Sequence, residues 1–174
     1  MRKKIVLLFS CIIFIIVLCL YSWKAIKIET TNLTDISIDN IVLGDDFENV
    51  NLTKYTKVDG YDDNYNYRFN EIAINVDNGI IDGLFSNFDN NVVISINGNT
   101  DLTKVNDVKD ILGGNFKDKW YDKEQELKTY IYYDYNNNIK ANFIYSNYDN
   151  NLVWIKLKKT NWKFKKYKLN HIII

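Results

Sequence analysis

The sequence predicts an α+β fold, an antiparallel and mostly β domain that follows one N-terminal transmembrane helix. Three observations lead to this prediction: a long apolar run at the N-terminus, period-two alternation in several later segments, and asparagine- or glycine-rich turns between them. We expect five parts along the 174 residues. They are a signal anchor at 1–24, a stalk at 25–35, a first α+β repeat at 36–99, a second at 100–160, and a basic aromatic tail at 161–174.

The N-terminal part is typical of an uncleaved signal anchor. Arg2, Lys3 and Lys4 precede an apolar run at 5–23, which as a helix spans about 28 Å, close to the ~30 Å hydrocarbon core of a bilayer. The basic cap predicts a cytoplasmic N-terminus and a single-pass membrane protein whose domain lies outside the cytoplasm. The residues expected to contact the membrane are Ile5, Leu8, Ile12, Ile16, Leu20, Tyr21 and Trp23.

Cleavage and lipidation are the alternatives to an uncleaved anchor. The stretch "LCLYSWKAI" at 18–26 has no small-x-small exit for a signal peptidase. Cys11 follows a small residue, but the apolar run continues well beyond it, and Cys19 follows the bulky Leu18. These are the only two cysteines, so the exported part can form no disulfide and offers no cysteine nucleophile or metal ligand.

Charge is unevenly distributed, although the formal net charge is zero. Residues 1–24 carry four basic side chains and no acid, residues 25–155 carry eleven basic and twenty-two acidic ones, and residues 156–174 carry seven lysines and no acid. An acidic body excludes general binding of nucleic acid or of an anionic membrane. We therefore expect no nucleic-acid partner.

The first repeat begins with the extended segment "ISIDNIVL" and a break at Gly44. Asp45 or Asp46 is placed to cap a short helix with Phe47 and Val50 on one face. Alternating aromatics at 65–69 predict a strand, and the shift of apolar parity at Ile72 requires a turn or bulge near 70–71. "DNG" at 77–79 predicts the turn into the strand "IIDGLFS".

The stretch "DGYDDNYNYRFN" raises the question of a calcium loop. An EF-hand requires Gly at its sixth and Glu at its twelfth position, where this stretch has Asn64 and Asn70. "DYNNNIKANFIY", from Asp134, has Ile139 at its sixth position. We therefore expect solvated turns at both places, and no metal site.

The second half of the chain begins with the strand "VVISING" at 92–98. The second repeat then opens on the best helix pattern of the exported part, "DLTKVNDVKDILGG". Asp101 or Thr103 is expected to cap this helix and Gly113 to end it. "KDKWYDKEQEL" is expected to be a charged connection. Three strands at 129–135, 139–146 and 152–158 are expected to follow, with asparagine-rich turns between them.

"LGDDFENV" and "LTKVNDVKDILGG", each followed by aromatic strands, resemble the tandem helix-plus-meander domains of the beta-lactamase-inhibitor-protein-like fold. Small exported Gram-positive proteins share this layout. The resemblance covers about residues 36–158, and it implies action by binding proteins, with no catalytic residues to carry over. The chain departs from the family in lacking disulfides and in having Gly113-Gly114-Asn115 where Gly-Lys-Pro is common.

Catalytic chemistry finds little support in the sequence. The one histidine, His171, is four residues from the end of the chain, and the exported part has no cysteine for a zinc site. Glu124 and Glu126 lie in the expected charged connection, where solvation is the simplest reading. Arg68, between Tyr67 and Phe69, is expected to pair within the structure, with ligand binding as the alternative. No cofactor is expected.

The tail "KLKKTNWKFKKYKLNHIII" interleaves lysines with aromatic residues. This pattern suits an anionic surface such as lipid headgroups or a wall polymer. The alternative is that the tail packs its aromatic residues on the sheet. The candidate contact residues are Lys159, Trp162, Lys163, Phe164, Lys165, Lys166, Tyr167 and Lys168.

Three functions follow from these observations. The first is a membrane-anchored extracytoplasmic interaction module with a protein partner, which predicts an exposed apolar or aromatic patch on the sheet. The second is an envelope enzyme or ligand sensor, which predicts a pocket with converging polar groups and shifted pKa values. The third is a toxin-immunity or phage-encoded protein with a single protein partner.

Overall fold

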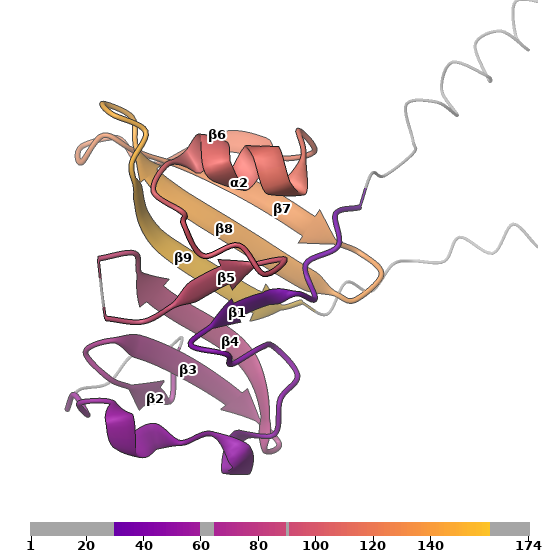
Figure 1. The fold of residues 1–174 in the computed structure, drawn as a ribbon, viewed down its shortest axis with the longest axis vertical. Helices are drawn as coiled ribbons and strands as arrows, with labels where there is room; N and C mark the ends of the chain where they lie inside the picture. Colours follow the sequence, from indigo (N-terminus) through magenta and orange to yellow (C-terminus); the bar gives the residue numbers. More distant parts are fainter. Residues whose placement is uncertain (1–29, 60–64, 90, 161–174) are drawn as a thin grey trace, which may run out of the picture.

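The computed structural model describes residues 30–59, 65–89 and 91–160. Its main feature is an antiparallel seven-stranded sheet with strand order β2-β3-β4-β9-β8-β7-β6 (Figure 1). A separate two-stranded sheet pairs β1 (Ile36–Ile38) with β5 (Ile94–Ile96). The strands of the large sheet are β2 (Tyr67–Arg68), β3 (Ile72–Asp77), β4 (Ile80–Asn87), β6 (Lys117–Asp122), β7 (Leu127–Asp134), β8 (Ile139–Ser146) and β9 (Leu152–Lys159).

Short turns connect most neighbouring strands, as the sequence predicts. Asn78 and Gly79 both have positive φ, 51° and 81°, which is the backbone of a type I′ hairpin turn between β3 and β4. Asn138 and Asn150 also have positive φ in the turns that lead into β8 and β9. The expected turn at the parity shift lies between β2 and β3, where Phe69 N–H donates to the Ile72 carbonyl at 2.9 Å.

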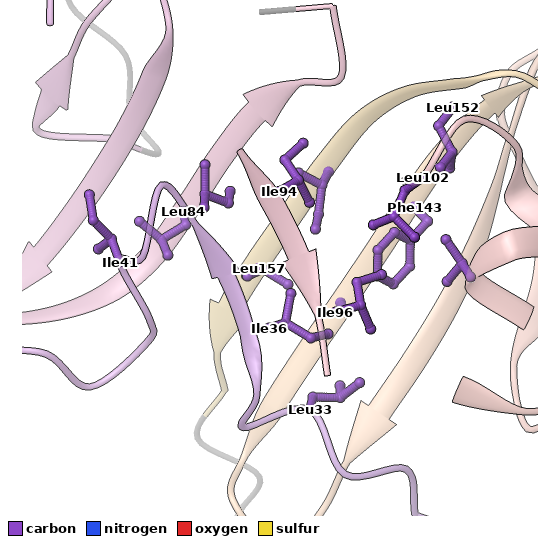
Figure 2. Packing of buried hydrophobic residues seen from close by; sticks show 14 of the residues in the cluster. Leu33, Ile36, Ile41, Leu84, Ile94, Ile96, Leu102, Phe143, Leu152 and Leu157 are labelled. Carbon is purple, nitrogen blue, oxygen red and sulfur yellow. The ribbon is translucent and has the colours of Figure 1, made fainter. Parts of the chain in front are cut away.

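The hydrophobic core lies on one face of the large sheet, which we call the covered face. The small β1–β5 sheet and the helix α2 (Val105–Leu112) pack across it (Figure 1). Figure 2 shows Ile36 and Ile96 of the small sheet beside Leu157 and Phe143 of the large one. All four side chains are at most 1% exposed, so these layers close one core across both halves of the chain.

Helix α2 is held at both ends. Its buried side chains are Val105 and Val108, and the Asp107 carboxylate accepts hydrogen bonds from the backbone N–H groups of Thr103 and Lys104, at 2.9 and 2.8 Å. The N-cap is Lys104, so the expected cap at Asp101 or Thr103 is wrong by at least one residue. The predicted end at Gly113 is confirmed.

The expected helix in the first half is wrong. Residues 47–54 form two separate single turns of 3₁₀ helix, η1 (Phe47–Asn49) and η2 (Leu52–Lys54). The side chains of Asp46 and Asn51 each accept a hydrogen bond from an N–H two residues ahead. These local bonds form two separate caps, so the segment restarts at Asn51 and no continuous α-helix forms.

The expected charged connection after α2 is instead the edge strand β6. Its residues pair with β7, from Lys117 opposite Ile131 to Asp122 opposite Leu127. Charged residues suit an edge strand because they oppose pairing with another chain. The second half therefore has one helix and four strands, and the pairing of β4 with β9 joins the strands of both halves into one sheet.

Part of the expected stalk is packed against the domain. Leu33 is 2% exposed, and its N–H donates to the Asp134 carboxylate at 3.1 Å. Asp134 also accepts from the N–H groups of Asn136 and Asn137, both at 3.0 Å. In the stretch "DYNNNIKANFIY", the Asp134 carboxylate therefore stabilises the turn before β8 and fixes the chain segment that leads into the domain.

The membrane-anchor residues between Ile5 and Trp23 and the tail residues from Trp162 to Lys168 lie outside the described residues. Within the described part of the chain, no helix is long and apolar enough to cross a membrane.

Candidate functional site on the open face of the sheet

The face of the large sheet that points away from β1, β5 and α2 is the open face. Strand alternation and the observed register assign side chains to it, because Phe85, Lys156, Asn142 and Ile131 are cross-strand neighbours in one row. A neighbouring row contains Lys158, Lys140 and Tyr133. The other residues of this face include Arg68, Ala73, Asn75, Gly83, Asn87, Lys117, Lys119, Thr129, Ile144 and Trp154.

Basic side chains gather on this face although the domain is acidic. The described residues include nineteen acidic and thirteen basic side chains, a net charge of minus six. Six of the thirteen basic side chains belong to the open face: Arg68, Lys117, Lys119, Lys140, Lys156 and Lys158. The negative net charge of the domain therefore predicted a negative surface, whereas this face is positive. The strand register places lysines from β6, β8 and β9 side by side on it.

These six cations lack carboxylate partners within the described part of the chain. The salt bridges there are Lys54 with Asp39 at 2.7 Å and Lys128 with Asp118 at 3.1 Å, and neither includes a cation of the open face. Lys158 lies directly opposite Lys140. Like charges in direct opposition destabilise a sheet, so the face keeps an unfavourable charge arrangement.

Aromatic rings order the lysine at the centre of the face. Lys156 Nζ donates to the Tyr121 hydroxyl at 2.6 Å and lies 4.9 Å from the centre of that ring. It is also 5.5 Å from the centre of the Phe85 ring. Trp154 contacts the rings of both Phe85 and Tyr121, at centroid distances of 6.4 and 5.7 Å. The ammonium group is therefore held by cation–π attraction and a hydrogen bond.

A hollow of about 340 Å³ opens on this face between β2, β3, β4, β9 and β8. Its wall includes the rings of Tyr65 and Phe85 and the basic side chains of Arg68, Lys140, Lys156 and Lys158. Glu71, also in the wall, accepts the backbone N–H of Thr56 at 3.0 Å. The size lies within the range of small-ligand sites, and four of the five charged side chains in the wall are cationic.

Gly83 lines the hollow and keeps it deep, because a side chain at this position would fill part of the space. A Cβ there would lie 3.0 Å from Asn75 Cβ and 3.7 Å from the Tyr65 ring. Any larger residue would therefore push the opposite strand or the aromatic wall.

Two further observations concern groups that face the hollow or border it. Burial lowers the pKa of Lys140, and the nearby ammonium groups of Lys119 and Lys158 lower that pKa further. The side-chain Oδ1 atoms of Asn142 and Asn87 are buried and have no hydrogen-bond partner within the part of the chain that the structure describes. Asn142 lines the hollow, and a buried acceptor without a donor is costly unless something supplies one.

Few of the candidate residues from the sequence take part in this site. Arg68 lies on β2 and lines the hollow. Lys159 ends β9, and its Nζ donates to the Asn137 carbonyl at 3.3 Å. Glu124 and Glu126 are exposed in the turn between β6 and β7. His171 and residues 60–64 of the calcium question lie outside the described residues, within which no group of three or more His, Cys, Asp or Glu side chains gathers for a metal.

Sequence reasoning missed the lysines of β8 and β9. The signal was present in "IKANF" at 139–143 and "IKLK" at 155–158, where lysine or asparagine occupies alternate positions and apolar residues occupy the others. The cationic alternation gains meaning once Lys140 and Lys158 are known to be neighbours.

Comparison of the chain with protein-family models, with curated proteins and with solved structures finds no match.

Proposed function

We propose that this chain is a membrane-anchored extracytoplasmic binding module, and that the open face of its sheet holds an anionic partner. The observation that carries the proposal is the group of six cations without carboxylate partners in the described residues, on a domain whose net charge is negative. The anchored, extracytoplasmic placement rests on the basic cap and apolar run at the N-terminus.

Solubility alone does not account for this charge pattern. A sheet face without a covering layer needs charged side chains, but mixed signs serve that need with less repulsion. Here Lys140 and Lys158 oppose each other across β8 and β9, and Lys119 lies close enough to lower the pKa of Lys140. An arrangement that is unfavourable in the free protein becomes favourable when an anion binds, because the anion removes the repulsion.

The groups in the hollow favour binding over catalysis. Its described polar groups are three ammonium groups, one guanidinium group, three side-chain amides, the Tyr65 hydroxyl and the Glu71 carboxylate. The cations and amides recognise and position anions. Phe85 and Trp154 are only partly exposed, and the Lys156 ammonium group lies over the Phe85 and Tyr121 rings, so the face is a charged site more than an apolar docking patch. Of the functions considered from the sequence, this favours ligand binding over both an envelope enzyme and a module that docks a protein through an apolar patch.

The test is photo-cross-linking in intact cells with the full chain. A photoreactive residue replaces Lys119 on the open face or, as a matched control, the exposed Lys109 on α2. The proposal expects a cross-linked species from position 119 and none from position 109. It also expects loss of that species when Lys140, Lys156 and Lys158 are changed to glutamate. Equal labelling from both positions, or labelling that survives charge reversal, would contradict it.

A further inference from the structure

We infer that the ligand of the open face is an anionic polyol, a chain of hydroxyl-bearing units linked or substituted by phosphate or carboxylate groups. This inference rests on the proposed function and adds the chemical class of the partner. Three features of the face carry it: unpaired buried amide oxygens, aromatic walls, and a row of cations longer than the hollow.

The unpaired amide oxygens favour a ligand that carries hydroxyl groups. Asn142 lines the hollow, and its Oδ1 atom is buried without a hydrogen-bond partner among the described residues. Asn87 lies outside the hollow, opposite Trp154 on the same face, and its Oδ1 atom is in the same condition. A hydroxyl both donates and accepts, so it satisfies a side-chain amide in either of its two orientations. A simple anion such as inorganic phosphate dianion brings mainly acceptors, which would pair with the lysines and leave Asn142 Oδ1 unpaired.

The aromatic rings in the wall of the hollow can pack against the C–H groups of a ligand whose hydroxyls bond to these amides. The Tyr65 and Phe85 rings, with centroids 6.0 Å apart, stand at one side of the hollow. Lys140, Lys156 and Lys158 of β8 and β9 also line it, and Lys156 lies next to Phe85. A polyol or sugar unit has an apolar C–H face for the rings and hydroxyls for the amides. Its anionic group then reaches the ammonium groups, which as point charges accept phosphate or carboxylate alike.

The cations continue beyond the hollow toward the sheet edge. The row that contains Lys156 on β9 passes Asn142 and Ile131 and reaches Lys117 on β6. Three strand spacings separate the two lysines, or about 14 Å. Lys119 on the same edge strand adds a further charge. A ligand with repeated charges would use both ends of this row, whereas a single small anion would use only the hollow.

The experiment measures affinity by calorimetry with the full chain in neutral detergent. The probes are oligo(glycerol phosphate), polyphosphate with the same number of charges, poly-glutamate and neutral dextran. All are repeated in a background with Lys163, Lys165, Lys166 and Lys168 changed to glutamine, because these tail lysines can bind anions independently. We expect oligo(glycerol phosphate) to bind about tenfold more tightly than polyphosphate, since one additional satisfied buried group is worth about that factor.

Two variants separate the parts of the inference. In Asn142→Leu, the tenfold preference should disappear while polyphosphate binding stays, which also shows that the variant folds. In the triple variant K140Q/K156Q/K158Q, binding of both anions should fall strongly. Equal affinity for both anions would overturn the polyol inference and leave the anionic face standing, and tightest binding of poly-glutamate would do the same in favour of an acidic protein segment. Binding unaffected by the triple variant, or no binding of any anion, would overturn the proposed function as well.

Discussion

Lys158 on β9 lies directly opposite Lys140 on β8, so the sheet places two ammonium groups side by side on its open face. Burial and the charges of Lys119 and Lys158 lower the pKa of Lys140. A lysine whose folded pKa is below its unfolded value of 10.5 lowers stability at neutral pH, because the unfolded chain holds that proton more tightly. The arrangement is therefore a cost to folding that an anionic ligand would relieve.

The first prediction concerns this repulsion. Lys140→Gln should raise the free energy of unfolding by about 0.5 kcal/mol near neutral pH, since it removes a like-charge pair. The gain should shrink as pH rises toward 10.5, where the wild-type lysine loses its proton. Urea titrations across that pH range measure it. Lys123→Gln, in the exposed turn between β6 and β7, is the matched control, and an equal gain in both variants would contradict the argument.

The second prediction concerns the floor of the hollow. Gly83→Ala should lower the free energy of unfolding by about 1 kcal/mol or more and reduce affinity for anionic probes, because the new Cβ meets Asn75 Cβ at 3.0 Å. Thermal unfolding and calorimetry check the two effects. Gly114→Ala provides the control, since a Cβ there meets nothing within 4 Å. Unchanged binding in a folded Gly83→Ala protein would show that ligands do not reach this depth.

The third prediction concerns the carboxylate that holds the incoming chain. Burial raises the pKa of Asp134, but hydrogen bonds from Asn137, Leu33 and Asn136 outweigh burial and keep that pKa below 3.8. Its stabilising effect is therefore complete above pH 3.8 and is lost as pH falls through the folded pKa. Asp134→Asn should lower stability by about 2 kcal/mol at neutral pH.

The measurement for Asp134 is denaturant unfolding at neutral and acidic pH. Below the folded pKa the difference between Asp134→Asn and the wild type should narrow, because the wild-type carboxyl is then neutral too. Asp110→Asn, at an exposed position of α2, should change stability much less at either pH. A constant difference at all pH values would show that charge is not the relevant property of Asp134.

The fourth prediction concerns a tyrosine on the covered side. Tyr55 donates to the Asp39 carboxylate at 2.9 Å, and burial together with this carboxylate raises the pKa of Tyr55 to about 12. The raised pKa stabilises the fold below pH 10, and that contribution disappears as pH rises through about 12. Tyr55→Phe should cost about 1 kcal/mol at neutral pH and should flatten the loss of stability between pH 10 and 12.

Urea unfolding at neutral and alkaline pH tests this expectation for Tyr55. The control is Tyr148→Phe, because Tyr148 is 89% exposed in a turn and its loss should leave the pH profile unchanged. If Tyr55→Phe kept the full alkaline loss of the wild type, the titration would belong to other groups.

Local patterns were sufficient for much of the chain. Alternation placed β7, β8 and β9 within two residues of their observed bounds, and "DNG" gave the β3–β4 turn, because strand pairing and I′ turns depend on a few adjacent residues. The α2 periodicity also held, with Val105 and Val108 buried. The errors at η1, η2 and β6 arose where side-chain caps or edge pairing outweighed weak periodicity.

The sequence by itself determined an antiparallel α+β domain, its turns, its helix and its lack of thiols outside the N-terminal run. Tertiary structure alone decided that Arg68 and lysines from β6, β8 and β9 share one face. These residues are up to ninety positions apart, and only the register of β4, β9 and β8 brings Phe85, Lys156 and Asn142 into one row. A side-chain pattern records which face of a strand is apolar, whereas strand order and register decide which polar groups meet on the other.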